Sequence, residues 1–460
     1  LSSFILKDVN KEILFNFLRE MEFNRLLSQT ISFYGESVES SQKEIEKKTK
    51  ITKIDINKYK SIVNETDLDN LIKKLNEKSI IAVDCETSSL NPINAELVGV
   101  SFSSDIDEAY YIPVAHKKVK SLNTEFVIKK IKNILEDSSI KKVGQNIKYD
   151  FMVFKKYGIN INPIEDTMLL SYTLDAGNNR HNMDILSEIH LGHKTISYKE
   201  IVGSGKKQLN FSDVSLEEAT KYAAEDADVT LRLYNILKSR VDNEKLNKIY
   251  EVFEKPLVKL LSKIEMNGIK VDDSYLKKLS KKFEERLIKK EKEIYKISGK
   301  EFNIGSPKQL GEIIYHDLKI AKLKKTKKGS LATSAKVLED LALTGHKFPK
   351  LIIEWRQDSK LKSTYTDALQ DHINKNTKRV HTSFLLAATN TGRLASSDPN
   401  LQNIPIKSTD GKEIRKAFIA DKGNILISAD YNQIEMRILA DMADVKELKK
   451  AFKNNQDIHS

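Results

Sequence analysis

Four short segments of this 460-residue chain place carboxylates at spacings that could hold divalent metal ions. They are Asp84–Thr87, Asn146–Asp150, Tyr222–Asp226 and Ser428–Tyr431. Carboxylate oxygens suit Mg²⁺ or Mn²⁺, and two such ions about 4 Å apart activate water and stabilise a leaving oxygen when a phosphodiester bond breaks. The first three segments are predicted to form one site, and the fourth to begin another.

The Asp84/Glu86 pair follows the apolar run Ile80–Val83, which is typical of a buried strand. Side chains alternate along a strand, so both carboxylates should share one face while Cys85 points away. Two carboxylates this close repel each other unless cations neutralise them. An isolated Asp-x-Glu is common without any catalytic role, and it is the addition of Asp150 and Asp226 that favours a metal site.

Tyr222 precedes Asp226 by four residues on a predicted helix, so the phenol and the carboxylate should lie on the same face. In that position the phenol could orient a metal-activated water.

The remaining pattern predicts the elements that must position these residues. From residue 54 predicted strands alternate with predicted helices. Leu97–Phe102 has the apolar pattern of a strand, and Phe126–Leu135 and Leu216–Leu237 have the pattern of helices. After about residue 240 long helices dominate; one is capped at Asp272 and ends near Gly299, and another starts at Ser306. Residues 1–36 have helical apolar spacing, and the polar stretch up to residue 53 is typical of a linker.

Composition narrows the class of partner and compartment. A net charge of +12 favours a polyanionic partner, although a low-GC genome, which makes Lys, Ile and Asn abundant, would give the same excess of positive charge. The single cysteine excludes an internal disulfide, and no apolar run approaches the roughly 20 residues of a membrane span. We therefore expect a cytoplasmic protein. The chain begins with Leu1 and stops at Ser460 in mid-pattern, so we expect a fragment at both ends.

The set Asp84/Glu86, Asn146/Asp150 and Tyr222/Asp226 resembles the three motifs of the DEDDy 3′–5′ exonucleases. The longer runs Gly144–Asp150 and Tyr222–Thr230 are similar to the proofreading domain of bacterial polymerases of the polymerase I type. The resemblance implies that Asp84, Glu86 and Asp226 bind the metals and that Asp150 acts mainly on the second ion. It also implies that Tyr222 and Glu86 position the water. Cys85 stands where Thr is usual, and we expect no loss of activity from this change.

The second site begins at a predicted buried strand, Ile425–Ala429, which ends at Asp430. An amphipathic helix should follow from Gln433, with Leu439 and Met442 on its apolar face. Taken alone, an aspartate in this place could simply cap the helix.

The whole segment resembles family A DNA polymerases, whose first palm motif matches Asp430–Arg437. The resemblance implies that Asp430 binds both metals on the incoming nucleotide, and that Glu435 excludes ribonucleotides by crowding the sugar 2′ position. The resemblance also implies that Tyr431 and Gln433 contact the nucleotide. The residues implied to bind the primer–template duplex are Lys360, Lys362, Ser363, Thr364, Arg393, Gln402 and Asn403. The four residues from 360 to 364 belong to Trp355–Tyr365, which is similar to a polymerase thumb segment.

The predicted fold class is α/β: a ribonuclease H-like exonuclease domain with a mixed sheet flanked by helices, then a mostly helical thumb and the start of an α+β palm. The expected division is 1–53 helical remnant and linker after a 5′-nuclease domain, 54–240 exonuclease, 241–378 thumb and 379–460 palm. The resemblance implies a DNA-directed DNA polymerase with a proofreading 3′–5′ exonuclease, acting in replication and repair. It would be a monomer near the nucleoid, using two Mg²⁺ or Mn²⁺ ions per active site.

The implied partners are primer–template duplex, single-stranded DNA 3′ ends and, for the full-length parent, deoxynucleoside triphosphates. The family's cationic nucleotide-binding helix and second palm carboxylate are expected beyond Ser460, so the 460 residues should retain only exonuclease activity and DNA binding. Two alternatives remain: a stand-alone exoribonuclease of the ribonuclease D type, and a DNA-binding fragment whose sites do not assemble.

Overall fold

The computed structural model describes residues 9–21, 54–117, 121–205, 208–322 and 329–456, with residues 23, 26, 27, 29, 30, 34, 119 and 326. Helix α1, Lys11–Glu20, lies within the predicted helical segment. Its buried apolar residues are Phe15 and Leu18, whereas Ile13, Phe17 and Met21 of the expected apolar face are exposed. The expected linker, up to residue 53, lies outside the described residues.

A six-stranded mixed sheet forms the centre of the first half of the chain, in the order β1-β4-β3-β2-β5-β6. Its strands are β1 Lys60–Ser61, β2 Ile80–Thr87, β3 Leu97–Asp105, β4 Glu108–Pro113, β5 Lys141–Gly144 and β6 Ile164–Asp166. Strand β3 pairs antiparallel with β2 and β4, whereas β2–β5, β5–β6 and β1–β4 are parallel. The predicted mixed sheet flanked by helices is confirmed.

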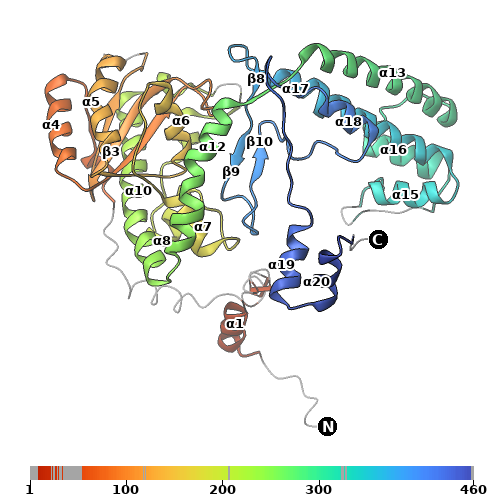
Figure 1. Cartoon of the computed structure of the whole chain (residues 1–460), viewed down its shortest axis with the longest axis horizontal. Helices are drawn as coiled ribbons and strands as arrows, with labels where there is room; N and C mark the ends of the chain where they lie inside the picture. The colour runs from red at the N-terminus through yellow and green to blue at the C-terminus, as the bar shows by residue number, and fades with distance from the viewer. Residues whose placement is uncertain are drawn as a thin grey trace, which may run out of the picture.

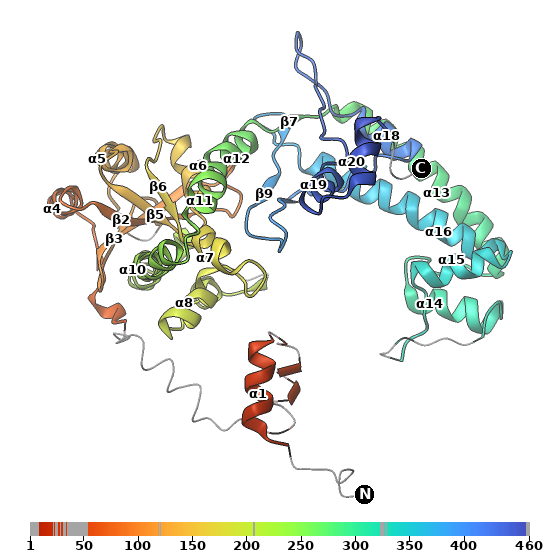
Figure 2. The same cartoon turned by 60° about the horizontal axis from the view of Figure 1, so that its bottom comes forward.

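Helices cover both faces of this sheet. They are α4 Glu65–Asn76, α5 Thr124–Glu136, α6 Lys148–Lys156, α7 Thr167–Asp175, α8 Met183–Leu191, α9 Tyr198–Val202, α10 Leu216–Asn243, α11 Asn247–Ile249 and α12 Lys255–Asn267. Helices α4 and α5 lie on one side of the sheet and α10 on the other (Figures 1 and 2). The expected boundary at residue 240 falls inside α10, and Val258 and Leu261 of α12 belong to the same core as the sheet.

The second half begins with an arm of helices beyond α12 (Figure 1). It contains α13 Asp273–Ser298, α14 Pro307–Glu312, α15 Ala335–Leu343, α16 Lys347–Lys360 and α17 Ala368–Asp371. The predicted limits of α13 are confirmed, since the Asp272 side chain accepts a hydrogen bond from the Tyr275 amide at 3.0 Å and Gly299 adopts a φ of 72°. Ser306 caps α14 as predicted.

Two small β pairs join the sheet domain to this arm. They are β7 Ile269–Lys270 with β8 Arg379–Val380, and the hairpin β9 Ser383–Leu385 with β10 Ala395–Ser397. Figure 1 shows β9 and β10 beside α12. Helices α18 Thr409–Arg415, α19 Ile434–Met442 and α20 Lys446–Lys453 follow.

The predicted buried strand Ile425–Ala429 is wrong. This segment is irregular, with Ile425 80% and Ile427 82% exposed. A strand needs a neighbour to take its backbone hydrogen bonds, and the described part of the chain pairs none with it. Figure 2 shows the chain between α18 and α19 standing away from the packed helices. The predicted helix after Gln433 is present, but Leu439 and Met442 are exposed.

Within the described ranges, no helix is both long and apolar enough to cross a membrane.

Candidate active sites

Three of the predicted metal ligands converge at one place. Asp84 and Glu86 come from β2 and Asp226 from α10, and one oxygen of each lies within 4.8 Å of the other two. Glu86 and Asp226 are buried, and Asp84 is half-buried. A compact set of carboxylate oxygens fits a hard divalent cation, which prefers oxygen ligands.

Asp150 approaches the same strand from α6. Its Oδ1 atom accepts a hydrogen bond from the Cys85 amide at 2.9 Å, so it lies against the backbone between Asp84 and Glu86. Asp150 is not a member of the three-carboxylate cluster. The Cys85 side chain belongs to the hydrophobic core, as predicted, but its thiol also lies within hydrogen-bonding reach of the Asp150 carboxylate.

The electrostatics of these groups favour the binding of a cation. Burial raises the pKa of Asp84 to about 6. Burial, with repulsion from Asp84, raises the pKa values of Glu86, Asp150 and Asp226 well above their ordinary range. A bound cation would reverse this penalty, because it stabilises the ionised form of each carboxylate.

Tyr222 lies one helical turn before Asp226, within hydrogen-bonding reach of its carboxylate. Burial raises the pKa of this phenol, so it stays protonated. Its ring packs against Phe211 and Tyr198, at centroid distances of 5.9 and 6.1 Å. Sequence reasoning missed these two aromatic residues, because they come from separate segments and form no motif with Tyr222.

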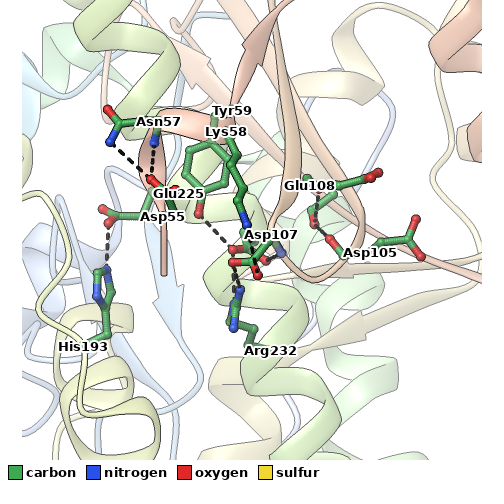
Figure 3. A network of polar contacts seen from close by, with 12 residues as sticks. Asp55, Asn57, Lys58, Tyr59, Asp105, Asp107, Glu108, His193, Glu225 and Arg232 are labelled. Atoms are coloured by element: carbon green, nitrogen blue, oxygen red, sulfur yellow. Dashed lines mark hydrogen bonds and ion pairs between the residues drawn. The ribbon is translucent and has the colours of Figure 1, made fainter. Parts of the chain in front are cut away.

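A polar network anchors α10 beside the site (Figure 3). Buried Asp228 accepts hydrogen bonds from the Tyr59 hydroxyl at 2.8 Å and from Arg232 Nε at 3.1 Å. Arg232 also binds Asp107, in the β3–β4 turn, at 2.7 Å. The helix that carries Tyr222 and Asp226 is therefore tied to the edge of the sheet.

The residue next to Asp226 is anchored as well. The buried Glu225 carboxylate accepts a hydrogen bond from the Ile196 amide at 2.7 Å and is paired with His193 Nε2 at 2.8 Å, the latter contact visible in Figure 3. This pairing holds the segment that leads into Tyr198. Sequence reasoning missed this role of Glu225 and the role of Asp228, although both lie inside the quoted motif.

The polymerase-like residues are arranged differently. Asp430 and Tyr431 lie on the exposed irregular segment, and Gln433 adopts a φ of 54° at the start of α19. Glu435, in the first turn of α19, forms an exposed ion pair with Arg393. Among the described residues, Asp430 joins no group of three potential metal ligands.

Two of the predicted DNA-binding residues, Lys360 and Asn403, line one cavity. This cavity of about 460 Å³ is lined by Lys360, Asn403 and Lys407, among others, which brings the thumb-like helix α16 next to the segment after β10. Lys362 instead pairs with Asp367 at 2.8 Å. The remaining members make local contacts or are exposed: Ser363 donates to the Ser359 carbonyl oxygen, Gln402 donates to the Leu394 carbonyl oxygen, and Thr364 is exposed.

Two family profiles match the chain. Residues 59–242 match the 3′–5′ exonuclease family and residues 273–460 match DNA polymerase family A. DNA polymerase I of Rhizobium leguminosarum is 46% identical over 87% of this chain, and that of Pseudomonas aeruginosa is 41% identical over 98%. The matches cover 42% and 49% of those two proteins, so the chain spans less than half of each relative's length.

A solved structure, the POL domain of Pol1 from M. smegmatis in complex with DNA primer-template and dNTP, has a TM-score of 0.72 at 26% identity. The match covers 87% of this chain and 65% of that one. The chain therefore combines an exonuclease-like segment, which contains the carboxylate cluster, with a polymerase-like segment after it. Residues 273–460 are thus similar to DNA polymerase family A, and residues 59–242 to the 3′–5′ exonuclease family.

Proposed function

We propose that this chain removes nucleotides from the 3′ end of DNA in a metal-dependent hydrolysis. The observation that carries the proposal is the convergence of Asp84, Glu86 and Asp226, with Asp150 behind them. Asp84, Glu86 and Asp226 would hold Mg²⁺ or Mn²⁺, with Asp150 contributing to the second of two ions. Such ions, when bound, supply an activated water and stabilise the leaving oxygen.

The chain's own residues would prepare the reaction around that centre. Tyr222 is kept protonated by burial, with its hydroxyl within reach of Asp226; in the metal-loaded site this phenol would orient the attacking water, together with Glu86. Asp150 fixes the backbone of β2 so that Asp84 and Glu86 stay on one face. The anchors at Asp228 and Glu225 set the rotation of α10 and hence the position of Asp226.

We propose DNA-directed DNA synthesis as the activity of the whole protein to which these residues belong. The match of residues 273–460 to DNA polymerase family A and the similarity to two DNA polymerases I support this proposal. In that protein Asp430 would bind the metals, Tyr431, Gln433 and Glu435 would contact the incoming deoxynucleoside triphosphate, and Arg393, Gln402 and Asn403 the primer–template. Lys360, Lys362, Ser363 and Thr364 would grip the duplex backbone.

The proposed domains are an exonuclease over 54–240, a thumb over 241–378 and a palm region over 379–460. The whole protein would be a monomer that works on DNA of the nucleoid in the cytoplasm, in replication and repair. The net charge of +12 suits this polyanionic partner. A ribonuclease D-like role lacks support from the family A match, which covers residues 273–460.

The test compares 5′-labelled single-stranded DNA and RNA of the same sequence, each with Mg²⁺, with Mn²⁺ and with EDTA. Shortening of DNA from the 3′ end, stopped by EDTA, supports the proposal. Preferential degradation of RNA would favour the ribonuclease reading, and no degradation of either would favour an inert DNA-binding fragment.

A further inference from the structure

The exonuclease domain and the β9–β10 hairpin meet at one buried ion pair. Lys148, at the start of α6, pairs through Nζ with Glu265 Oε1 on α12, and the two side chains are only 7% and 2% exposed. The same Glu265 oxygen accepts a hydrogen bond from the Phe384 amide at 2.7 Å. Lys148 Nζ also donates to the Phe384 carbonyl oxygen. Both backbone polar groups of one β9 residue are therefore bound by this pair.

Further contacts hold the same segment. The Tyr172 hydroxyl of α7 donates to the Thr389 carbonyl oxygen at 2.7 Å, and His381 Nδ1 bonds the Glu265 carbonyl oxygen at 2.7 Å. A buried charged group has lost its hydration, so it needs hydrogen-bond or ion-pair partners in the protein to replace the lost water. If β9 moved away, the Lys148 ammonium and the Glu265 carboxylate would each lose one partner, so the pair and the hairpin depend on each other.

Each side of this junction leads to a functional segment. On one side, Asp150 lies two residues after Lys148 on α6 and holds the Cys85 amide between Asp84 and Glu86. On the other side, the hairpin carries residues 391–394, from which Arg393 pairs with Glu435. A short chain of interactions thus runs from Phe384 through Lys148 and Asp150 to the carboxylate cluster.

We propose that Lys148 and Glu265 are positioning residues that make the geometry of the exonuclease metal site depend on the docked β9–β10 hairpin. This inference rests on the exonuclease activity proposed above. When the hairpin is seated, α6 is held and Asp150 keeps β2 in place. When the pair is broken, α6 gains freedom, and the carboxylates bind metal in a less defined arrangement.

The experiment uses the full 460-residue chain with Lys148→Met and, separately, Glu265→Gln. Glu265→Gln keeps an oxygen that can accept the hydrogen bond of the Phe384 amide. If Lys148→Met does not fold, Glu265→Gln still tests the inference. On single-stranded DNA, each folded variant should lose at least tenfold in kcat, with KM changed less than twofold. The Mg²⁺ concentration for half-maximal rate should rise at least threefold, a shift that a loss of folded protein alone does not produce.

Lys142→Met is the matched control. Lys142 is also a buried lysine, but its ammonium donates to the carbonyl oxygens of Asp137, Ile140 and Asn162, within the exonuclease domain. At a temperature where it is folded, this variant should keep the wild-type kcat and Mg²⁺ dependence.

Hydrogen exchange supplies a readout that does not need activity. Breaking the pair should speed exchange both in α6 and in residues 383–397, whereas Lys142→Met should leave residues 383–397 unchanged. Wild-type kcat and Mg²⁺ dependence in both folded variants, or unchanged exchange in residues 383–397, would overturn the inference. If the wild-type chain lacks exonuclease activity, the proposed function fails while the exchange result still decides whether the junction couples the two segments.

Discussion

Asp150 holds the Cys85 amide at 2.9 Å, and through that hydrogen bond one carboxylate fixes the strand that presents two others. Asp84 and Glu86 flank Cys85, so the pleat of β2 sets the distance between their two carboxylates. The position of α6, which carries Asp150, sets where this part of β2 lies. This relationship makes the site sensitive to changes in its ligands and in their supports.

The double variant Asp84→Ala/Glu86→Ala should lose roughly a thousandfold or more in exonuclease rate, because it removes metal ligation worth several kcal/mol in the transition state. The measurement is single-turnover cleavage of 3′-labelled single-stranded DNA with Mg²⁺. Asp69→Asn, in an exposed pair with Lys130, is the matched control and should retain the wild-type rate. Undiminished cleavage by the double variant would remove these residues from the mechanism.

In EDTA, the stability of the chain should fall as the pH rises. The Asp84 pKa is about 6 in the folded protein, above its unfolded value, so the folded state holds more protons between roughly pH 4 and 6. The free energy of unfolding should therefore decrease through that window, by about 1–3 kcal/mol from this group. The raised pKa values of Glu86, Asp150 and Asp226 extend the decline to higher pH.

Urea unfolding at a series of pH values measures this effect, and Asp84→Asn should flatten the dependence. Saturating Mg²⁺ should reduce the decline, since metal binding favours the ionised carboxylates. A metal-free stability that rises between pH 5 and 7 would contradict the prediction.

Asp228→Asn should destabilise the exonuclease domain. Asp228 is buried and paired with Arg232, and removing one charge of a buried pair costs about 3–5 kcal/mol when the partner stays behind. Thermal unfolding should show the loss, whereas Asp69→Asn should shift Tm little. Arg232 retains Asp107 as a partner, so the cost should lie at the lower end of that range. A Tm equal to that of the wild type would show that the network in Figure 3 does not anchor α10.

Lys360→Ala with Lys407→Ala should weaken duplex DNA binding and flatten its salt dependence. Both residues line the cavity beside α16, and each phosphate that is no longer neutralised changes the slope of log affinity against log salt by about 0.9. Fluorescence anisotropy across a salt series measures the slope. The control is Lys130→Ala, outside the proposed duplex-binding residues, whose ammonium is paired with Asp69 and which should leave the slope unchanged. Equal slopes for the wild type and the double variant would place the duplex elsewhere.

The 460-residue chain should not extend a primer, because Asp430 lies on an exposed segment and joins no second carboxylate cluster among the described residues. Asp430→Asn should also leave exonuclease activity within about twofold of the wild type, since no metal ligand of that site is altered. A template-directed extension assay tests the first expectation. If the wild-type chain extends the primer and Asp430→Asn abolishes that extension, the polymerase site is assembled in this chain.

The sequence by itself determined the features that depend on neighbours along the chain. The alternation in β2 placed Asp84 and Glu86 on one face and Cys85 in the core, and the caps at Asp272 and Ser306 set two helix starts. Four-residue spacing brought Tyr222 and Asp226 together on α10. These are local effects of backbone geometry and hydrogen bonding, which a short stretch of residues fixes.

Only the tertiary structure decided the contacts between distant segments. The apolar run Ile425–Ala429 has the composition of a buried strand, yet it stays exposed because no strand of the described chain pairs with it. Lys148 and Glu265 lie 117 residues apart, and neither carries a local signal of the other. A buried charge is stable only where folding delivers its partner, so such pairs become visible only when the chain is folded.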